Sequence, residues 1–390
     1  MNQIQRARFA VSLYFLIGGT ALALWSVHIP SVETRLGIDH PQFGTALVAL
    51  GAGAFAALQL VGWIADHYGS RLITAIGGLL MGLSMFLPTF AANYAQLIGA
   101  IFVMGFAMGF LDGSMNAHGV LVERAYGRPI FSGMHALWSA GGLVGAGIGW
   151  LTLSAGLPMQ VTVPAGGVVL AVAGVLAYFW LLPSGPSHAV NADHTKEDKA
   201  AATLANRKFL WIVLAFGFMS GFAALAEGTA VDWSALLATT VLHTTDAVAA
   251  TGLAAFSITM TVSRFIADKV VEKRGRYFVL RWGSLLCIVA LILVGLAINL
   301  PLVLVGWLIL GVGASSLVPQ LFAVAAEVGE SSHSGRNLSK VMALTYFGVL
   351  GGPAIIGWLA ATPLGLNGAI GSVAILCLLI FLASPLVKRK

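Results

Sequence analysis

Charged residues are scarce in this sequence. Only 9% of the 390 residues are Asp, Glu, Lys or Arg, whereas 58% are hydrophobic and the mean hydropathy is +0.90. A soluble globular protein carries roughly 25% charged residues, because its surface must be hydrated. The shortage excludes an ordinary soluble domain and predicts an all-α polytopic membrane protein whose surroundings are the lipid bilayer.

Cysteine and the common catalytic motifs are also nearly absent. Cys287 and Cys377 each lie inside an apolar run, where a thiol packs as a small hydrophobic group. The sequence contains no Walker A pattern, no His-Glu-x-x-His and no Gly-x-Ser-x-Gly, so nothing indicates nucleotide, metal or nucleophilic chemistry. We therefore predict a protein that is not an enzyme and has no disulfide, metal site or other cofactor.

What the sequence does contain is long apolar windows, each able to cross a bilayer at about twenty residues. The twelve windows are 9–29, 42–64, 72–91, 95–120, 132–154, 162–183, 209–231, 247–267, 279–299, 301–325, 340–361 and 366–386. The first is too long for the apolar core of a signal peptide, so we take it as an uncleaved helix. A polar break predicts an N-terminal six-helix bundle at 1–183, a cytoplasmic linker at 184–208 and a C-terminal six-helix bundle at 209–390.

The basic residues predict the orientation. The net charge of +6 is spread between apolar runs, which does not fit a nucleic-acid binder. With the N-terminus inside, Arg35 is the only one of the 21 basic residues in an outer segment, and the other 20 lie in inner segments. This bias places both termini in the cytoplasm and favours a bacterial inner membrane.

Weak internal symmetry indicates a duplicated chain. Asp66 and Asp268 end corresponding apolar runs. Gly109, Asn116 and Glu123 stand at a constant offset from Gly313, Gln320 and Glu327, and Gly149-Trp150-Leu151 matches Gly357-Trp358-Leu359.

The stretch Gly62-Trp63-Ile64-Ala65-Asp66-His67-Tyr68-Gly69-Ser70-Arg71 resembles the signature loop of the major facilitator superfamily (MFS), G-x-x-x-D-[RK]-x-G-[RK]-[RK]. Gly62, Asp66, Gly69 and Arg71 match, whereas His67 and Ser70 replace basic residues. The resemblance covers essentially the whole chain. It implies two pseudo-symmetric six-helix bundles, secondary transport by alternating access and a monomer.

Within the superfamily, the sequence looks most like the bacterial fucose-permease-like branch of proton symporters. The residues that carry this likeness are Glu227-Gly228, Asp232-Trp233-Ser234, Met115-Asn116 and Glu123-Arg124.

Gating is expected at the loop 62–71 and at the corresponding segment around Asp268 in the second half of the chain. Asp66 can face either a neighbouring helix N-terminus or Arg124, and such a contact contributes roughly 0.3–1 kcal/mol. The alternative is that the loop only marks a solvated turn. The expected gating residues are Asp66, Gly69, Arg71, Arg124, Arg264 and Asp268.

Acids within apolar runs point to proton coupling. A charge at the bilayer centre costs roughly 2.5–3.5 kcal/mol on insertion scales. A charged residue is therefore expected there only where it has a function or a partner of opposite charge. Asp112, Glu227 and Asp232 are the candidates, since burial disfavours a charged carboxylate and lets it bind and release a proton. The alternative is a structural hydrogen bond or ion pair, but we expect no basic residue at the same depth.

A polar, sugar-like solute needs ring faces and hydrogen-bonding groups, which the expected cavity helices offer. The candidate substrate-binding residues are Trp25, His28, Asn116, His135, Trp138 and Gln320. Two of these candidates have a structural alternative, because His135 and Trp138 can also lie between helices. Two other tryptophans, Trp233 and Trp180, fit interfacial anchors.

The sequence thus predicts a transporter that moves a small polar solute together with protons. One alternative is a proton-driven efflux antiporter. Antiporters of the family that this sequence resembles carry a Gly-Pro motif in their fifth helix, and the fifth apolar window, 132–154, has none. The other is a membrane receptor or sensor that binds ligand without transport.

Overall fold

The structure is a computed structural model that describes residues 2–38, 40–184, 196–244, 246–328 and 334–388. Within these ranges all regular structure is helical and no strand occurs, which confirms the predicted all-α class. Residues 185–195 of the expected linker lie outside the described residues. The remainder of that segment, from Lys196 onward, begins a long helix.

The chain divides into two compact units. Unit 1 comprises Met1–Arg128, Met134–Ala192 and Glu330–Ser339, and unit 2 comprises Pro129–Gly133, Asp193–Gly329 and Lys340–Lys390. The helices are α1 (Gln3–Val27), α2 (Ile29–Leu36), α3 (His40–Tyr68), α4 (Ser70–Ser84), α5 (Phe86–Phe90), α6 (Tyr94–Tyr126), α7 (Phe131–Ser154), α8 (Met159–Tyr178), α9 (Lys196–Thr240), α10 (Asp246–Leu296), α11 (Leu300–Ala314), α12 (Leu317–Ala326), α13 (Ser334–Ala360), α14 (Gly365–Ala383) and a final 3-10 turn, Ser384–Lys388. Each unit therefore includes the first residues of a helix, α13 or α7, whose remainder belongs to the other unit.

Eleven helical spans in the described ranges are long and apolar enough to cross a membrane. One of them, Thr251–Leu296, has 46 residues, about twice what a bilayer requires. Gly275 interrupts it with φ 81° and ψ 162°, values that favour glycine because it lacks a Cβ atom. The helix α10 is therefore long enough for two crossings, and each of the twelve predicted windows overlaps one of these spans.

The turn at Gly275 repeats the turn at Gly69. Gly69 separates α3 from α4 with φ 84° and ψ 141°, close to the values at Gly275. Gly69 follows Asp66 by three positions, whereas Gly275 follows Asp268 by seven. The duplication is thus clearer in the backbone than in the sequence, because the second copy preserves the turn but not its spacing.

Arg35, the one basic residue expected on the outer side, caps the C-terminus of a helix. Its guanidinium donates hydrogen bonds to the carbonyl oxygens of Ala91 (2.6 Å) and Pro88 (3.3 Å), at the end of α5. The last carbonyls of a helix lack partners within the helix and attract a cation. A local structural role therefore accounts for the exception to the charge bias.

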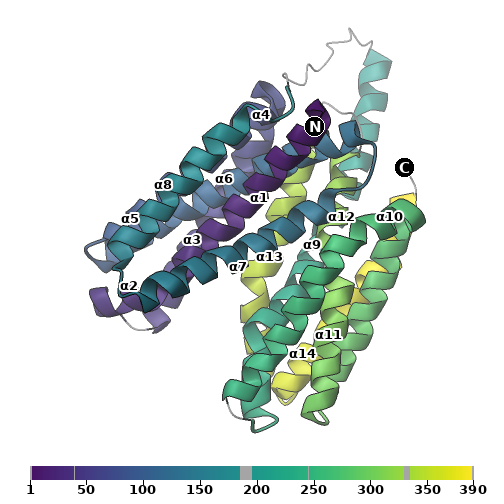
Figure 1. Ribbon diagram of the computed structural model, residues 1–390. Coiled ribbons are helices and arrows are strands. Elements are labelled where there is room, and N and C mark those ends of the chain that lie inside the picture. The colour runs from purple at the N-terminus through teal and green to yellow at the C-terminus, as the bar shows by residue number, and fades with distance from the viewer. Residues whose placement is uncertain (1, 39, 185–195, 245, 329–333, 389–390) are drawn as a thin grey trace. The chain divides into compact units, whose positions relative to one another are not determined.

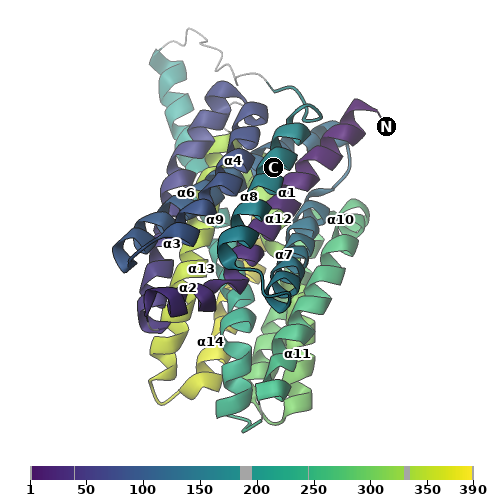
Figure 2. The same cartoon turned by 60° about the vertical axis from the view of Figure 1, so that its left-hand side comes forward.

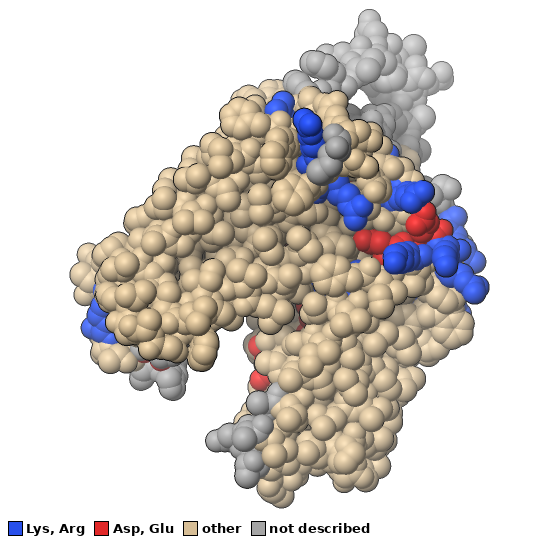
Figure 3. Space-filling view, in the orientation of Figure 1, with Lys and Arg blue, Asp and Glu red and all other residues tan. Residues whose placement is uncertain are grey.

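The helices of each unit pack side by side along their length. In unit 1, α4 contacts both α6 and α8, and α1 contacts the same two helices (Figures 1 and 2). In unit 2, α10 contacts α9, α11 and α14. The sides of the helices expose mainly apolar residues, whereas the Lys and Arg side chains in view gather toward the helix ends (Figure 3).

Close contact between α7 and α1 depends on glycine. A Cβ atom on Gly141 or Gly145 would overlap the carbonyl oxygen of Leu16 or Thr20 on α1. Small residues at such a contact let two helix backbones approach closely in a membrane protein. Gly141 and Gly145, which lie four residues apart in this helix, therefore serve packing.

Replacing Gly145 with alanine is expected to lower the apparent melting temperature of the purified protein, because the new methyl group meets the Thr20 carbonyl. Gly147→Ala is the matched control, since a Cβ there meets nothing within 4 Å and alanine favours a helix over glycine by roughly 0.5–1 kcal/mol. A thermal unfolding scan compares the two variants. Equal melting temperatures would contradict the close packing at Gly145.

Candidate functional site

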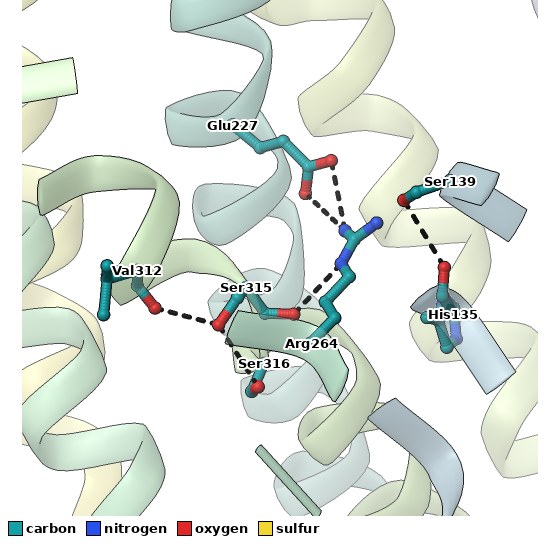
Figure 4. Close-up of polar contacts among 7 residues, drawn as sticks. All are labelled: His135, Ser139, Glu227, Arg264, Val312, Ser315 and Ser316. Atoms are coloured by element: carbon teal, nitrogen blue, oxygen red, sulfur yellow. Dashed lines mark hydrogen bonds and ion pairs between the residues drawn. The ribbon is translucent and has the colours of Figure 1, made fainter. Parts of the chain in front are cut away.

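A buried ion pair lies among the helices of unit 2. Arg264 on α10 donates from Nη2 to both carboxylate oxygens of Glu227 on α9, at 3.3 and 3.4 Å (Figure 4). The Arg264 side chain is 8% exposed and that of Glu227 is 29% exposed. Pairing two opposite charges offsets part of the cost of removing each from water. The carboxylate side remains partly open.

A break in a neighbouring helix provides the third contact of this site. The helix α11 ends at Ala314 and α12 begins at Leu317, which leaves Ser315 and Ser316 as a connecting turn. The carbonyl oxygen of Ser315 accepts a hydrogen bond from Arg264 Nε at 3.2 Å (Figure 4). A neutral acceptor and an acid thus both contact Arg264, and protonation of the acid weakens only the second contact.

This pair corrects one expectation from the sequence, that no basic residue lies at the depth of Glu227. The gating role of Arg264 stays a prediction. The helix α9 continues to Thr240, nine positions beyond the apolar window that ends at 231. Glu227 consequently lies near the middle of its span, within reach of the long Arg264 side chain.

Three candidate residues of unit 1 form one hydrogen-bonded group. The Nδ2 atom of Asn116 donates to Oδ1 of Asp112 at 2.8 Å, and both residues lie on α6. The remaining amide oxygen, Oδ1, lies 3.1 Å from Nε2 of His135 on α7. Because this oxygen can only accept, His135 donates from Nε2 in this arrangement. The sequence identified all three residues as candidates but did not indicate that they form one group.

Asp66 caps the N-terminus of a helix. Its two carboxylate oxygens accept hydrogen bonds from the backbone N–H groups of Gly335 and Arg336, each at 3.0 Å, in the first turn of α13. The side chain is buried, at 9% exposure. The first N–H groups of a helix lack partners within it and carry partial positive charge, so a carboxylate stabilises them.

Asp268 makes the same kind of contact in unit 2. Its carboxylate accepts from the N–H groups of Ser132 (2.9 Å) and Gly133 (2.6 Å), in the first turn of α7. Asp66 therefore caps α13 and Asp268 caps α7, and these two helices correspond to each other in the repeat. Asp268 performs this role although the sequence around it departs from the signature loop.

Gln320 belongs to the Asp268 cluster. Its Oε1 accepts from Arg276 Nη1 at 2.6 Å, and its Nε2 donates to Ser132 Oγ at 3.0 Å. Arg276 also pairs with Glu327 at 3.3 Å. The amide of Gln320 is fully buried and hydrogen-bonded on both sides, so in this structure it belongs to the helix-capping network, and its role in substrate binding stays a prediction. Arg276 and Ser132 also belong to this network, and the sequence did not predict either of them. For Arg276 the available indication was the pair Gly275-Arg276, which resembles the Gly-[RK] part of the signature loop.

The remaining candidates are distributed over both units. Trp25 and His28 on and after α1 are buried, and Trp25 Nε1 and His28 Nε2 have no hydrogen-bond partner in the described ranges. Trp138 packs its ring against Gly18 of α1. Asp232 and Arg124 are exposed, and Arg71 stacks on Tyr178 at 4.5 Å.

Two overlapping segments of the chain, residues 10–251 and 228–390, match the sequence profile described as Major Facilitator Superfamily. Together they cover nearly the whole chain. The chain belongs to the Major Facilitator Superfamily. It is accordingly a multi-pass membrane protein and a transporter, and the family identified from the loop 62–71 is confirmed.

Relatives of this chain within the superfamily include an uncharacterised MFS-type transporter of Yersinia pestis, 32% identical over 97% of this chain and 94% of the relative. Among solved structures, the chain resembles FucP, the fucose:proton symporter of E. coli, in its outward conformation, with a TM-score of 0.81 at 14% identity over 100% of both chains. It also resembles the proton:xylose symporter XylE, with a TM-score of 0.78 at 13% identity over 97% of this chain and 94% of XylE. At these identities the structural likeness establishes the MFS fold, and it fits the fucose-permease-like branch.

Proposed function

We propose that the protein is a proton-coupled symporter that moves a small, sugar-like polar solute by alternating access across a bacterial inner membrane. The observation that carries this proposal is the Glu227–Arg264 ion pair, a partly open carboxylate bonded to a buried arginine. A proton on Glu227 neutralises the acid and weakens its hold on Arg264. The pair can therefore exist in two states that differ by one proton.

Coupling follows from competition for Arg264. A solute hydroxyl oxygen can accept the hydrogen bond that Arg264 otherwise donates to Glu227. The released carboxylate is then free to take up a proton, so that solute and proton favour each other's binding. The reciprocal effect holds for release, where loss of the solute returns Arg264 to Glu227 and expels the proton.

Support for a sugar-like solute comes from the polar groups and from the names of two structural neighbours. Asn116 and His135 present amide and imidazole groups in one hydrogen-bonded cluster with Asp112, and Trp25 and His28 have unpaired ring nitrogens. Such groups suit hydroxyls and ring faces. Fucose and xylose are the solutes named for FucP and XylE.

Proteoliposome uptake tests this proposal. A thermal-shift screen of the purified protein against sugars, nucleosides, peptides and organic acids first identifies a ligand, because a bound ligand stabilises the folded state. An imposed inward gradient of one pH unit is then expected to concentrate that ligand inside up to about tenfold for one proton per solute. Ligand leaving the vesicles would instead establish proton-driven export, and binding without flux would establish a receptor.

A further inference from the structure

A cavity at one end of unit 1 combines basic and aromatic side chains. Its volume is about 320 Å³, and its lining includes Gln3 and Arg6 of α1, Arg71 of α4, and Phe179, Trp180 and Pro183 after α8. None of these residues belongs to the ion-pair or histidine clusters described above. The cavity is therefore separate from those two clusters.

Both arginines here carry uncompensated charge. Within the described ranges, neither Arg6 nor Arg71 has a carboxylate at ion-pair distance. The guanidinium of Arg71 lies over the Tyr178 ring and donates from Nη2 to the Tyr178 carbonyl at 3.3 Å, while its Nε is buried without a hydrogen-bond partner. A buried guanidinium nitrogen normally has an acceptor. An anionic ligand in this cavity would supply the acceptor that Arg71 Nε does not have among the described residues.

The surroundings indicate what kind of anion fits. Phe9 and Trp180 pack together with ring centroids 5.9 Å apart, and Phe9, Phe179 and Trp180 are 52%, 68% and 49% exposed. Exposed aromatic rings at the ends of membrane helices lie at the level of lipid headgroups. Basic pockets between such helices bind the phosphate of anionic lipids. A soluble anion would not need the apolar rim.

We propose that this cavity binds the phosphodiester headgroup of an anionic phospholipid, with Arg6 and Arg71 on the phosphate and the aromatic rim against the acyl chains. Ser184 Oγ accepts from the Arg71 backbone N–H at 2.8 Å, which holds the first turn of α4 beside the cavity. The bound lipid would thus brace the end of the loop 62–71.

The test measures lipid binding by the full-length protein in neutral detergent. Its apparent melting temperature is followed against the mole fraction of phosphatidylglycerol, with phosphatidylcholine as the uncharged comparison. Phosphatidylglycerol is expected to stabilise the protein saturably and phosphatidylcholine is not. Arg6→Gln is expected to weaken the apparent phosphatidylglycerol affinity about fivefold, as one phosphate contact from an arginine near the membrane surface implies. The matched control is Arg274→Gln, an exposed arginine in unit 2, which should change the affinity less than twofold.

Two results would overturn the proposal. Equal losses in Arg6→Gln and Arg274→Gln would mean that phosphatidylglycerol acts through general charge and not through this cavity. Stabilisation by glycerol phosphate alone, lost in Arg6→Gln, would assign the cavity to a soluble phosphate compound instead of a lipid. Arg71→Gln provides a second readout, since it should weaken the binding further while phosphatidylcholine remains without effect.

Discussion

Replacing Glu227 with glutamine is expected to abolish accumulation of solute by a proton gradient while leaving exchange of solute across the membrane intact. Glutamine imitates the protonated acid, because it is neutral and has nearly the same shape. In the proposed cycle the wild-type carrier also passes through a state in which Glu227 is neutral, so the variant should still bind and exchange solute. Uptake under an imposed gradient and counterflow without one, in the same proteoliposomes, separate the two activities.

Glu272→Gln is the matched control, since it removes an exposed acid from the same unit, and it is expected to accumulate solute normally. Glu227→Gln is also expected to lose stability by about 1–2 kcal/mol, less than for a fully buried pair because the Glu227 side chain is 29% exposed. Undiminished accumulation in Glu227→Gln would remove this residue from the coupling role. Asp112 would then be the next candidate.

Replacing Asp66 with alanine is expected to speed hydrogen exchange at the start of α13, and Asp268→Ala should do the same at the start of α7. Each carboxylate accepts two backbone N–H bonds of a first helical turn. Loss of a helix cap costs about 1–2 kcal/mol, which corresponds to roughly 5- to 30-fold faster exchange where local opening limits it. Mass spectrometry of peptides that cover Gly335 and Ser132 gives the measurement.

The neighbouring residues supply the controls. His67→Ala and Lys269→Ala alter exposed side chains beside each acid and should leave both exchange rates unchanged. The prediction is specific in position, since each acid should affect only the helix that it caps. If Asp66→Ala leaves the exchange of Gly335 and Arg336 unchanged, the capping bonds do not hold that helix and Asp66 does not act as a gate there.

The helices were largely predictable because a membrane allows few alternatives. Every backbone N–H and C=O group within the bilayer must be bonded internally, so a long apolar window can only become a helix. The window 132–154 and the helix Phe131–Ser154 nearly coincide. The ends were less predictable where a helix continues past its apolar part, as α9 does.

The candidate site was only partly predictable. The sequence indicated Glu227, because an acid in an apolar run is conspicuous, but it did not indicate Arg264 as the partner. The side chain of arginine is long, and its charged end can lie far from its Cα atom. Gln320 is also a polar residue in an apolar run, yet its contacts are with Arg276 and Ser132, which are 44 and 188 residues away in sequence.

The sequence by itself determined the membrane class, the number of crossings, the duplication and the superfamily, since these follow from hydropathy, charge bias and one local loop. Only the tertiary structure decided which helix N-termini Asp66 and Asp268 cap, which arginine neutralises Glu227, and that Asp112, Asn116 and His135 form one group. Those outcomes depend on contacts between residues far apart in the chain. Periodicity and composition describe each helix separately, and they carry no information about which helices meet.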